Sequence, residues 1–121
     1  MSAEVKEIQI TRSNAMKEMD TIIKEVDSLE IDEKEKKTLL GKLKAKHKEI
    51  KSHFADLEKN PEKKISEKLK KGIGEVKDMI EAAGKKVKKG GSSAGAAMKK
   101  AVARAAAMSQ KTGKKLKSMF G

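Results

Sequence analysis

The sequence predicts an all-α protein: an antiparallel, coiled-coil-like helical hairpin followed by one or two basic amphipathic helices. Composition is the first reason. The 121 residues include one proline and only 2% aromatic residues, whereas Ala, Lys, Glu, Leu and Met abound, a balance that favours helix over strand. Spacing is the second reason, because apolar residues recur at alternating intervals of three and four, as on a helix that packs along one side.

Two such runs lie in the first sixty residues, on either side of a short polar turn. The first run comprises Val5, Ile8, Arg12, Ala15, Met19, Ile22, Val26 and Leu29. The second comprises Leu40, Leu43, His47, Ile50, Phe54 and Leu57. Between them, Asp32 is a good N-cap and Glu35, three residues on, completes a capping box. The short turn predicts that the two helices, within residues 3–59, lie antiparallel.

This hairpin is predicted to be a scaffold that self-associates. Met16, Ile23, Ile31 and Leu39 fall outside the two runs, so the apolar surface near the turn is wider than two helices need. A third helix or a second copy of the chain would cover it. We therefore expect homo-oligomers formed through residues 3–59, in which weak contacts made elsewhere in the chain are multiplied.

Charge divides the chain at about residue 60. Residues 1–60 hold 13 basic and 13 acidic residues, and residues 61–121 hold 17 basic and 5 acidic residues, so the second half carries the whole net charge of +12. Beyond Glu81, eleven basic residues follow without an acid. We expect residues 1–60 to form a neutral hairpin domain and residues 61–121 to form a basic helical region that binds a ligand.

The basic half begins with a third predicted helix. Asn60 can cap it and Pro61 suits its first position. Its apolar positions share one arc of the helix: Ile65, Leu69, Ile73, Val76, Ile80, Ala83 and Val87. The pattern is interrupted by glycines from Gly84 to Gly91, which are expected to end this helix.

A fourth helix is predicted beyond a Gly/Ser hinge near residues 90–95. Ser92 or Ser93 can cap it, and Thr112 with Gly113 is expected to end it. Its apolar side consists mainly of alanine, which allows close packing against a neighbour, while its lysines cluster on the remaining surface.

The segregated lysines predict a negatively charged partner, because a surface that is merely soluble mixes both signs. The chain has 28 Lys, only 2 Arg, and no Trp or Tyr. It can therefore neutralise phosphates but has few groups that read base edges or stack on bases. We expect sequence-independent binding of nucleic acid, duplex rather than single strand, by a protein that coats, compacts or packages DNA in a chromatin-like or viral nucleoprotein. The candidate contact residues are Lys85, Lys86, Lys88, Lys89, Lys99, Lys100, Arg104, Lys111, Lys114, Lys115 and Lys117.

An anionic membrane surface is the alternative partner. Helices with lysine on one face and apolar residues on the other can lie in the headgroup region. Leu116, Met119 and Phe120 form the segment best suited to insertion. In this alternative, the chain is a peripheral membrane-binding protein.

The residue types do not favour an enzyme. There is no cysteine, and no phosphate-binding loop or nucleophile motif occurs. His47 and His53 are six residues apart, about 240° around a helix, so they cannot ligate one metal ion from the same face. We expect no catalytic residues, no cofactor and no metal site.

Targeting features predict an intracellular protein, in the cytoplasm or nucleoid, or one inside a virus particle. The first residues lack the apolar segment of a Sec signal, and no apolar run approaches the roughly 18 residues of a membrane span.

Overall fold

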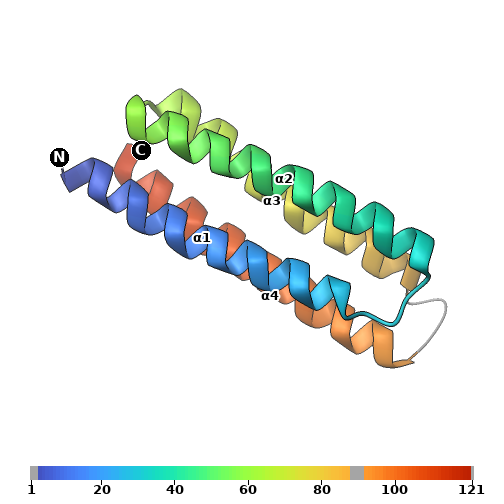
Figure 1. Ribbon diagram of the computed structural model, residues 1–121. Helices are drawn as coiled ribbons and strands as arrows, with labels where there is room; N and C mark the ends of the chain where they lie inside the picture. The colour runs from blue at the N-terminus through green and yellow to red at the C-terminus, as the bar shows by residue number, and fades with distance from the viewer. Residues whose placement is uncertain (1–2, 88–91, 121) are drawn as a thin grey trace.

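Four helices form an elongated bundle in the computed structural model, which describes residues 3–87 and 92–120 (Figure 1). They are α1 (Ala3–Asp27), α2 (Glu33–Lys59), α3 (Lys63–Val87) and α4 (Ser92–Phe120). Side chains are described for residues 5–85 and 95–120. The predicted all-helical class is confirmed, since these parts of the chain contain no strand.

The helices form a ring in which each contacts two others. α1 packs on α2, α2 on α3, α3 on α4, and α4 on α1. Among the described residues, no Cα atom of α1 comes within 8 Å of one in α3, and the same holds for α2 and α4, so these two pairs lie on the diagonals of the ring. The chain reverses direction from each helix to the next, so both termini lie at one end of the bundle (Figure 1).

One hydrophobic core runs through all four helices. The largest fully buried side chains are Ile8, Met19, Ile22, Leu43, Ile50, Phe54, Leu57, Leu69, Ile73, Ile80, Met98 and Met108. Burying each of them contributes roughly 1.5–3 kcal/mol. α3 and α4 therefore cover the apolar surface that α1 and α2 leave open.

The buried arc of α2 differs from the predicted one. Leu39, which was expected outside the run, is 5% exposed, whereas Leu40 is only partly buried. A run that faced α1 alone would favour Leu40. Because α2 also packs on α3, its buried side is rotated toward α3, and this rotation brings Leu39 into the core.

The predicted start of α2 is confirmed, whereas α3 begins later than predicted. The Glu35 backbone N–H donates to Asp32 Oδ2 at 3.3 Å, which confirms the N-cap. α3 begins at Lys63 instead of Pro61, and the Ser66 N–H donates to the Glu62 carbonyl at 3.1 Å. Asn60 instead ends α2, because its N–H donates to the Asp56 carbonyl.

The prediction that Thr112 and Gly113 end the last helix is wrong. α4 continues to Phe120. Thr112 is 5% exposed and Leu116, four residues on, is fully buried, so the buried side continues past Gly113. Core packing outweighs the roughly 1 kcal/mol that glycine costs inside a helix.

Gly84 does not interrupt α3, which ends at Val87. The hinge predicted near residues 90–95 is described only from Ser92 onward, where α4 begins; residues 88–91 lie outside the described residues.

Candidate nucleic-acid interface

The outward side of α4 carries lysines and no acid. The buried side of this helix is fixed by Met98, Ala101, Ala105, Met108 and Leu116. At 100° per residue, four lysines lie within about 60° of the opposite direction. They are Lys99, Lys100, Lys114 and Lys117, all exposed. We call them the α4 lysine face.

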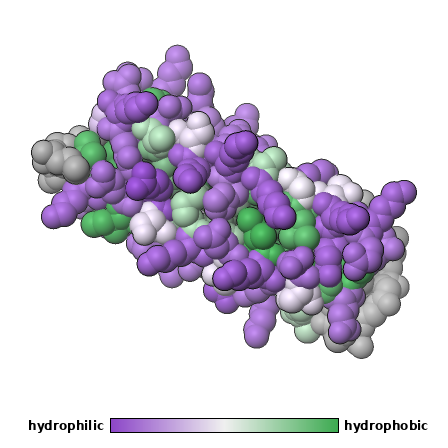
Figure 2. All heavy atoms as spheres, in the orientation of Figure 1, coloured by the Kyte–Doolittle hydropathy of each residue, from purple (hydrophilic) through white to green (hydrophobic). Residues whose placement is uncertain are grey.

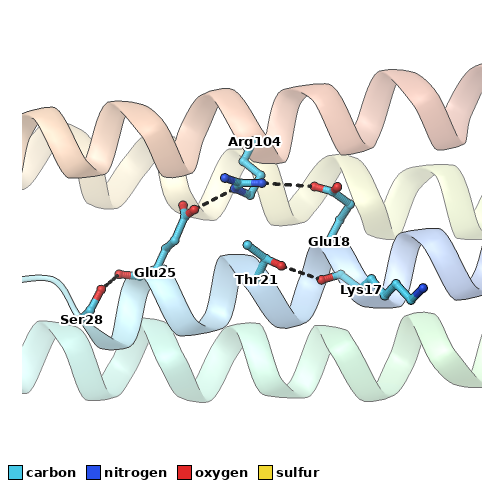
Figure 3. A network of polar contacts seen from close by, with 6 residues as sticks. All are labelled: Lys17, Glu18, Thr21, Glu25, Ser28 and Arg104. Carbon is cyan, nitrogen blue, oxygen red and sulfur yellow. Dashed lines mark hydrogen bonds and ion pairs between the residues drawn. The ribbon is translucent and has the colours of Figure 1, made fainter.

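Arg104 lies on the flank of α4 that meets α1, where acidic residues engage it (Figure 3). Its Nε donates a hydrogen bond to Glu25 Oε1 at 2.8 Å, and its Nη1 lies 3.9 Å from Glu18 Oε2. The charge of Arg104 is thus compensated by two carboxylates of α1, although its side chain remains 40% exposed. Of the predicted contact residues whose side chains are described, Arg104 alone takes part in an ion pair.

Lys111, Lys114 and Lys115 line an open groove of about 750 Å³ between α1 and α4. The α1 side of this groove brings Glu7, Lys17 and Glu18, together with apolar residues that include Ile10, whose side chain is 53% exposed. Because both signs line it, this groove is not a purely cationic pocket.

A second groove, of about 620 Å³, lies between α2 and α3 and also mixes signs. Lys34 and Lys42 line it together with Glu35, Glu75 and Asp78. Neither of these two grooves is lined by cations alone, whereas the α4 lysine face is.

Lys46 joins α2 to α3. Its Nζ lies 2.8 Å from Glu49 Oε2 and 3.2 Å from Glu75 Oε2. The hydrogen bond with Glu49 raises the pKa of Lys46 above its ordinary value, and the hydrogen bond from Lys46 lowers the pKa of Glu49. Both groups stay charged at neutral pH, so this lysine serves the fold.

Six further residues were predicted to contact the ligand. Lys85, Lys111 and Lys115 are exposed. Lys88 and Lys89 lie outside the described residues, as does the side chain of Lys86.

One basic surface was missed because the charges of residues 1–60 sum to zero. α2 alone holds nine basic and five acidic residues, and α1 holds four and six. Lys34, Lys37, Lys44 and Lys48 are exposed and lie within about 65° of the direction opposite the buried side of α2. We call them the α2 lysine face. Its signal in the sequence was the recurrence of lysine at intervals of three, seven and four.

Figure 2 shows the side of the bundle formed mainly by α1 and α2, where hydrophilic side chains dominate and apolar areas are small. The partly buried apolar residues of these two helices include Met16, Ile23 and Leu40. Most of the surface on this side is thus polar.

Acidic side chains contact the residues that interrupt the apolar runs. Arg12 Nη1 lies 2.9 Å from Glu58 Oε1, and His47 Nε2 lies 3.1 Å from Asp20 Oδ1. The other histidine, His53, lies 3.6 Å from Glu49. In the described parts of the chain, no group of three or more His, Cys, Asp or Glu side chains is arranged to hold a metal ion.

Comparison with known proteins gives no relative. No protein-family model matches the chain, and no curated protein and no solved structure is significantly similar to it. Across the described residues, no helix combines the length and the apolar character that a membrane span requires.

Proposed function

We propose that this protein binds duplex nucleic acid through its phosphates, without sequence preference, and so coats or compacts DNA. The observation that carries the proposal is α4, which holds seven basic residues and no acid along its 29 residues. Its outward surface is the α4 lysine face, and none of these four lysines takes part in an ion pair within the described structure.

The state of the two arginines supports binding without sequence preference. Arg12 pairs with Glu58 and Arg104 with Glu25, so the side chains best suited to bidentate guanine contacts are engaged within the bundle. The remaining cations are lysines, which act on phosphates as point charges. Phe54 is fully buried and Phe120 is partly buried, which leaves little aromatic surface for stacking on single-stranded bases.

The length of the α4 lysine face suits a duplex. Lys99 and Lys117 are eighteen residues apart, or about 27 Å at the helical rise of 1.5 Å per residue. This is slightly less than one turn of B-DNA, about 34 Å. One bundle would therefore contact phosphates over about one helical turn.

Salt dependence of binding tests the proposal. α4 exposes six lysines: Lys99, Lys100, Lys111, Lys114, Lys115 and Lys117. If they displace about six counterions, log affinity should fall with log salt concentration with a slope of about −5. The measurement is fluorescence anisotropy of two labelled duplexes of unrelated sequence, and we expect the same slope for both.

Two variants locate the contact. Replacing Lys99, Lys100, Lys114 and Lys117 with Gln should make the slope less steep by about 3 to 4. The matched control replaces Lys63, Lys64, Lys68 and Lys71, which are exposed near the start of α3. It removes the same charge. A slope near zero in the wild type, or an equal loss in both variants, contradicts the proposal.

The membrane alternative finds less support in the described contacts. Leu116 is fully buried, and Met119 and Phe120 pack against the core. Insertion of this segment into lipid would require the end of α4 to leave the bundle. Binding to anionic vesicles in preference to duplex, at equal salt, would favour the alternative.

Self-association through residues 3–59 stays a prediction. The surface that would mediate it is the outer side of the α1–α2 contact, where Met16, Ile23 and Leu40 are only partly buried. Sedimentation equilibrium of the wild type and of a Met16→Glu variant tests it, because a charge at this position should dissociate such an oligomer.

A further inference from the structure

Like the α4 lysine face, the α2 lysine face consists of four exposed lysines on the outward side of one helix. Along α2, Asp56, near the end of the helix, is the one acid within about 65° of its outward direction, and it lies eight residues beyond Lys48. Within the described structure, none of Lys34, Lys37, Lys44 and Lys48 is in an ion pair. Nearby Lys46 and Glu49, by contrast, pair with each other on the flank toward α3.

The two lysine faces point away from each other. α2 and α4 are diagonal members of the ring, and in the described residues none of their Cα atoms come within 8 Å of each other. Figure 1 shows them at opposite corners, with α2 above and in front and α4 below and behind. Because each face lies opposite the buried side of its own helix, the two faces are on opposite sides of the bundle, about 20–25 Å apart for two helix diameters.

The other two helices have outer faces of mixed sign. On α1, Asp20 lies between Lys17 and Lys24 on the outward side. On α3, the exposed acids Glu67 and Asp78 share the outward side with its lysines. A polyanion that moved from one lysine face to the other would have to cross one of these mixed surfaces, so the basic surface is divided in two.

We propose that one copy of this protein binds two duplexes at once, one on the α2 lysine face and one on the α4 lysine face. This inference rests on the proposed function, and it adds a second site and a mode of action. Bridging then needs no oligomer, because the bundle itself holds two phosphate-binding surfaces about one DNA diameter apart. The net charge of +12 offsets the repulsion between the two duplexes.

A two-duplex capture assay tests the inference with the full chain. A biotinylated duplex is fixed on beads, and a fluorescent duplex of another sequence is free in solution. Binding to the first duplex and recruitment of the second are measured separately, at low salt, where phosphate contacts are strong. The oligomeric state is followed by sedimentation equilibrium at the same concentration.

Three quadruple variants give the arms of the experiment. The α2 variant replaces Lys34, Lys37, Lys44 and Lys48 with Gln. The α4 variant and the α3 control are those described above. Gln has nearly the helix propensity of Lys, so circular dichroism should show the same helix content in all of them.

We expect the wild type to recruit the second duplex as a monomer. The α2 and α4 variants should each still bind the bead-bound duplex but lose recruitment, by about tenfold or more, while the α3 control recruits like the wild type.

Each other outcome has a definite meaning. A wild type that binds the first duplex but recruits no second one overturns bridging and leaves the proposed function standing, whereas a wild type that binds no duplex overturns both. Undiminished recruitment by the α2 variant overturns the assignment of the second site to α2. Recruitment that appears only when the protein sediments as an oligomer overturns bridging by a single copy.

Discussion

Arg104 on α4 and Glu25 on α1 form a side-chain hydrogen bond that links the first and the last helix of the bundle. The Nε–Oε1 distance is 2.8 Å, and Glu25 is the more buried partner, with 28% of its side chain exposed against 40% for Arg104. The other carboxylate oxygen of Glu25, Oε2, is buried and has no hydrogen-bond partner within the protein. The hydrogen bond from Arg104 therefore offsets part of the cost of desolvating the Glu25 carboxylate beside the core.

Removing the guanidinium should destabilise the bundle. Arg104→Met keeps the aliphatic stem but leaves the Glu25 carboxylate without its donor, and we expect the free energy of unfolding in urea to fall by about 1–2 kcal/mol. Glu25→Gln should cost less, because the amide oxygen still accepts from Nε. Lys24→Met, at an exposed position without an ion pair, is the control and should change stability by less than about 0.5 kcal/mol. A double-mutant cycle for Arg104 and Glu25 with no coupling would show that the pair contributes nothing.

The contacts of Lys46 predict a specific dependence of stability on pH. Since the pKa of Glu49 is lowered in the folded state, its contribution is present above the ordinary value of 4.5 and is lost as the pH falls through the lowered value. The pKa of Lys46 is raised, so its contribution is present below the ordinary value of 10.5 and is lost as the pH rises through the raised value.

Lys46→Met should therefore reduce the free energy of unfolding at pH 7 by about 0.5–1 kcal/mol, a modest figure because both carboxylates are 45% exposed. The difference from the wild type should shrink in acid, where the Glu49 carboxylate is protonated. Urea unfolding at neutral and acidic pH checks this. Lys42→Met removes an unpaired lysine of the same helix and should show no such convergence. A constant difference between Lys46→Met and the wild type would mean that these ion pairs do not stabilise the fold.

Gly113 tests the continuity of α4. A Cβ at this position would meet nothing within 4 Å, so Gly113→Ala should stabilise the protein by about 0.5–1 kcal/mol through higher helix propensity. Gly84→Ala is the matched comparison, because its Cβ would lie 3.2 Å from Met98 Cγ and the gain should be smaller or reversed. Thermal unfolding measures both changes. A loss of stability in Gly113→Ala would instead support a helix end at this glycine.

Leu116 distinguishes a core role from a membrane role. As a fully buried residue it should cost about 2–4 kcal/mol when replaced by Ala, whereas the partly buried Met119 should cost less. Chemical unfolding gives both values. A Leu116→Ala protein as stable as the wild type would show that the end of α4 is not docked. If the end of α4 is docked, a Leu116 variant could lose vesicle binding simply because the protein unfolds. Vesicle assays therefore need variants of exposed lysines, which leave the core intact.

Local rules allowed much of the helix pattern to be predicted. Spacing at three and four located the buried sides of α1 and α3 and most of that of α2, and the capping box at Asp32 located the start of α2. Local rules failed where tertiary packing competes with them. Gly113 predicted a helix end because glycine costs helix stability, but Leu116 gains more by reaching the core.

For the charged residues too, some properties follow from the sequence and others from the tertiary structure. The sequence by itself determined the all-helical class and the absence of acids after Glu81, since periodicity and composition are local properties. Only the tertiary structure decided which charges remain available. It engaged Arg104 with Glu25, and it placed the lysines of α2 and α4 on opposite corners. The physical reason is that burial fixes the direction in which each helix presents its polar side, and that direction depends on which helices are neighbours.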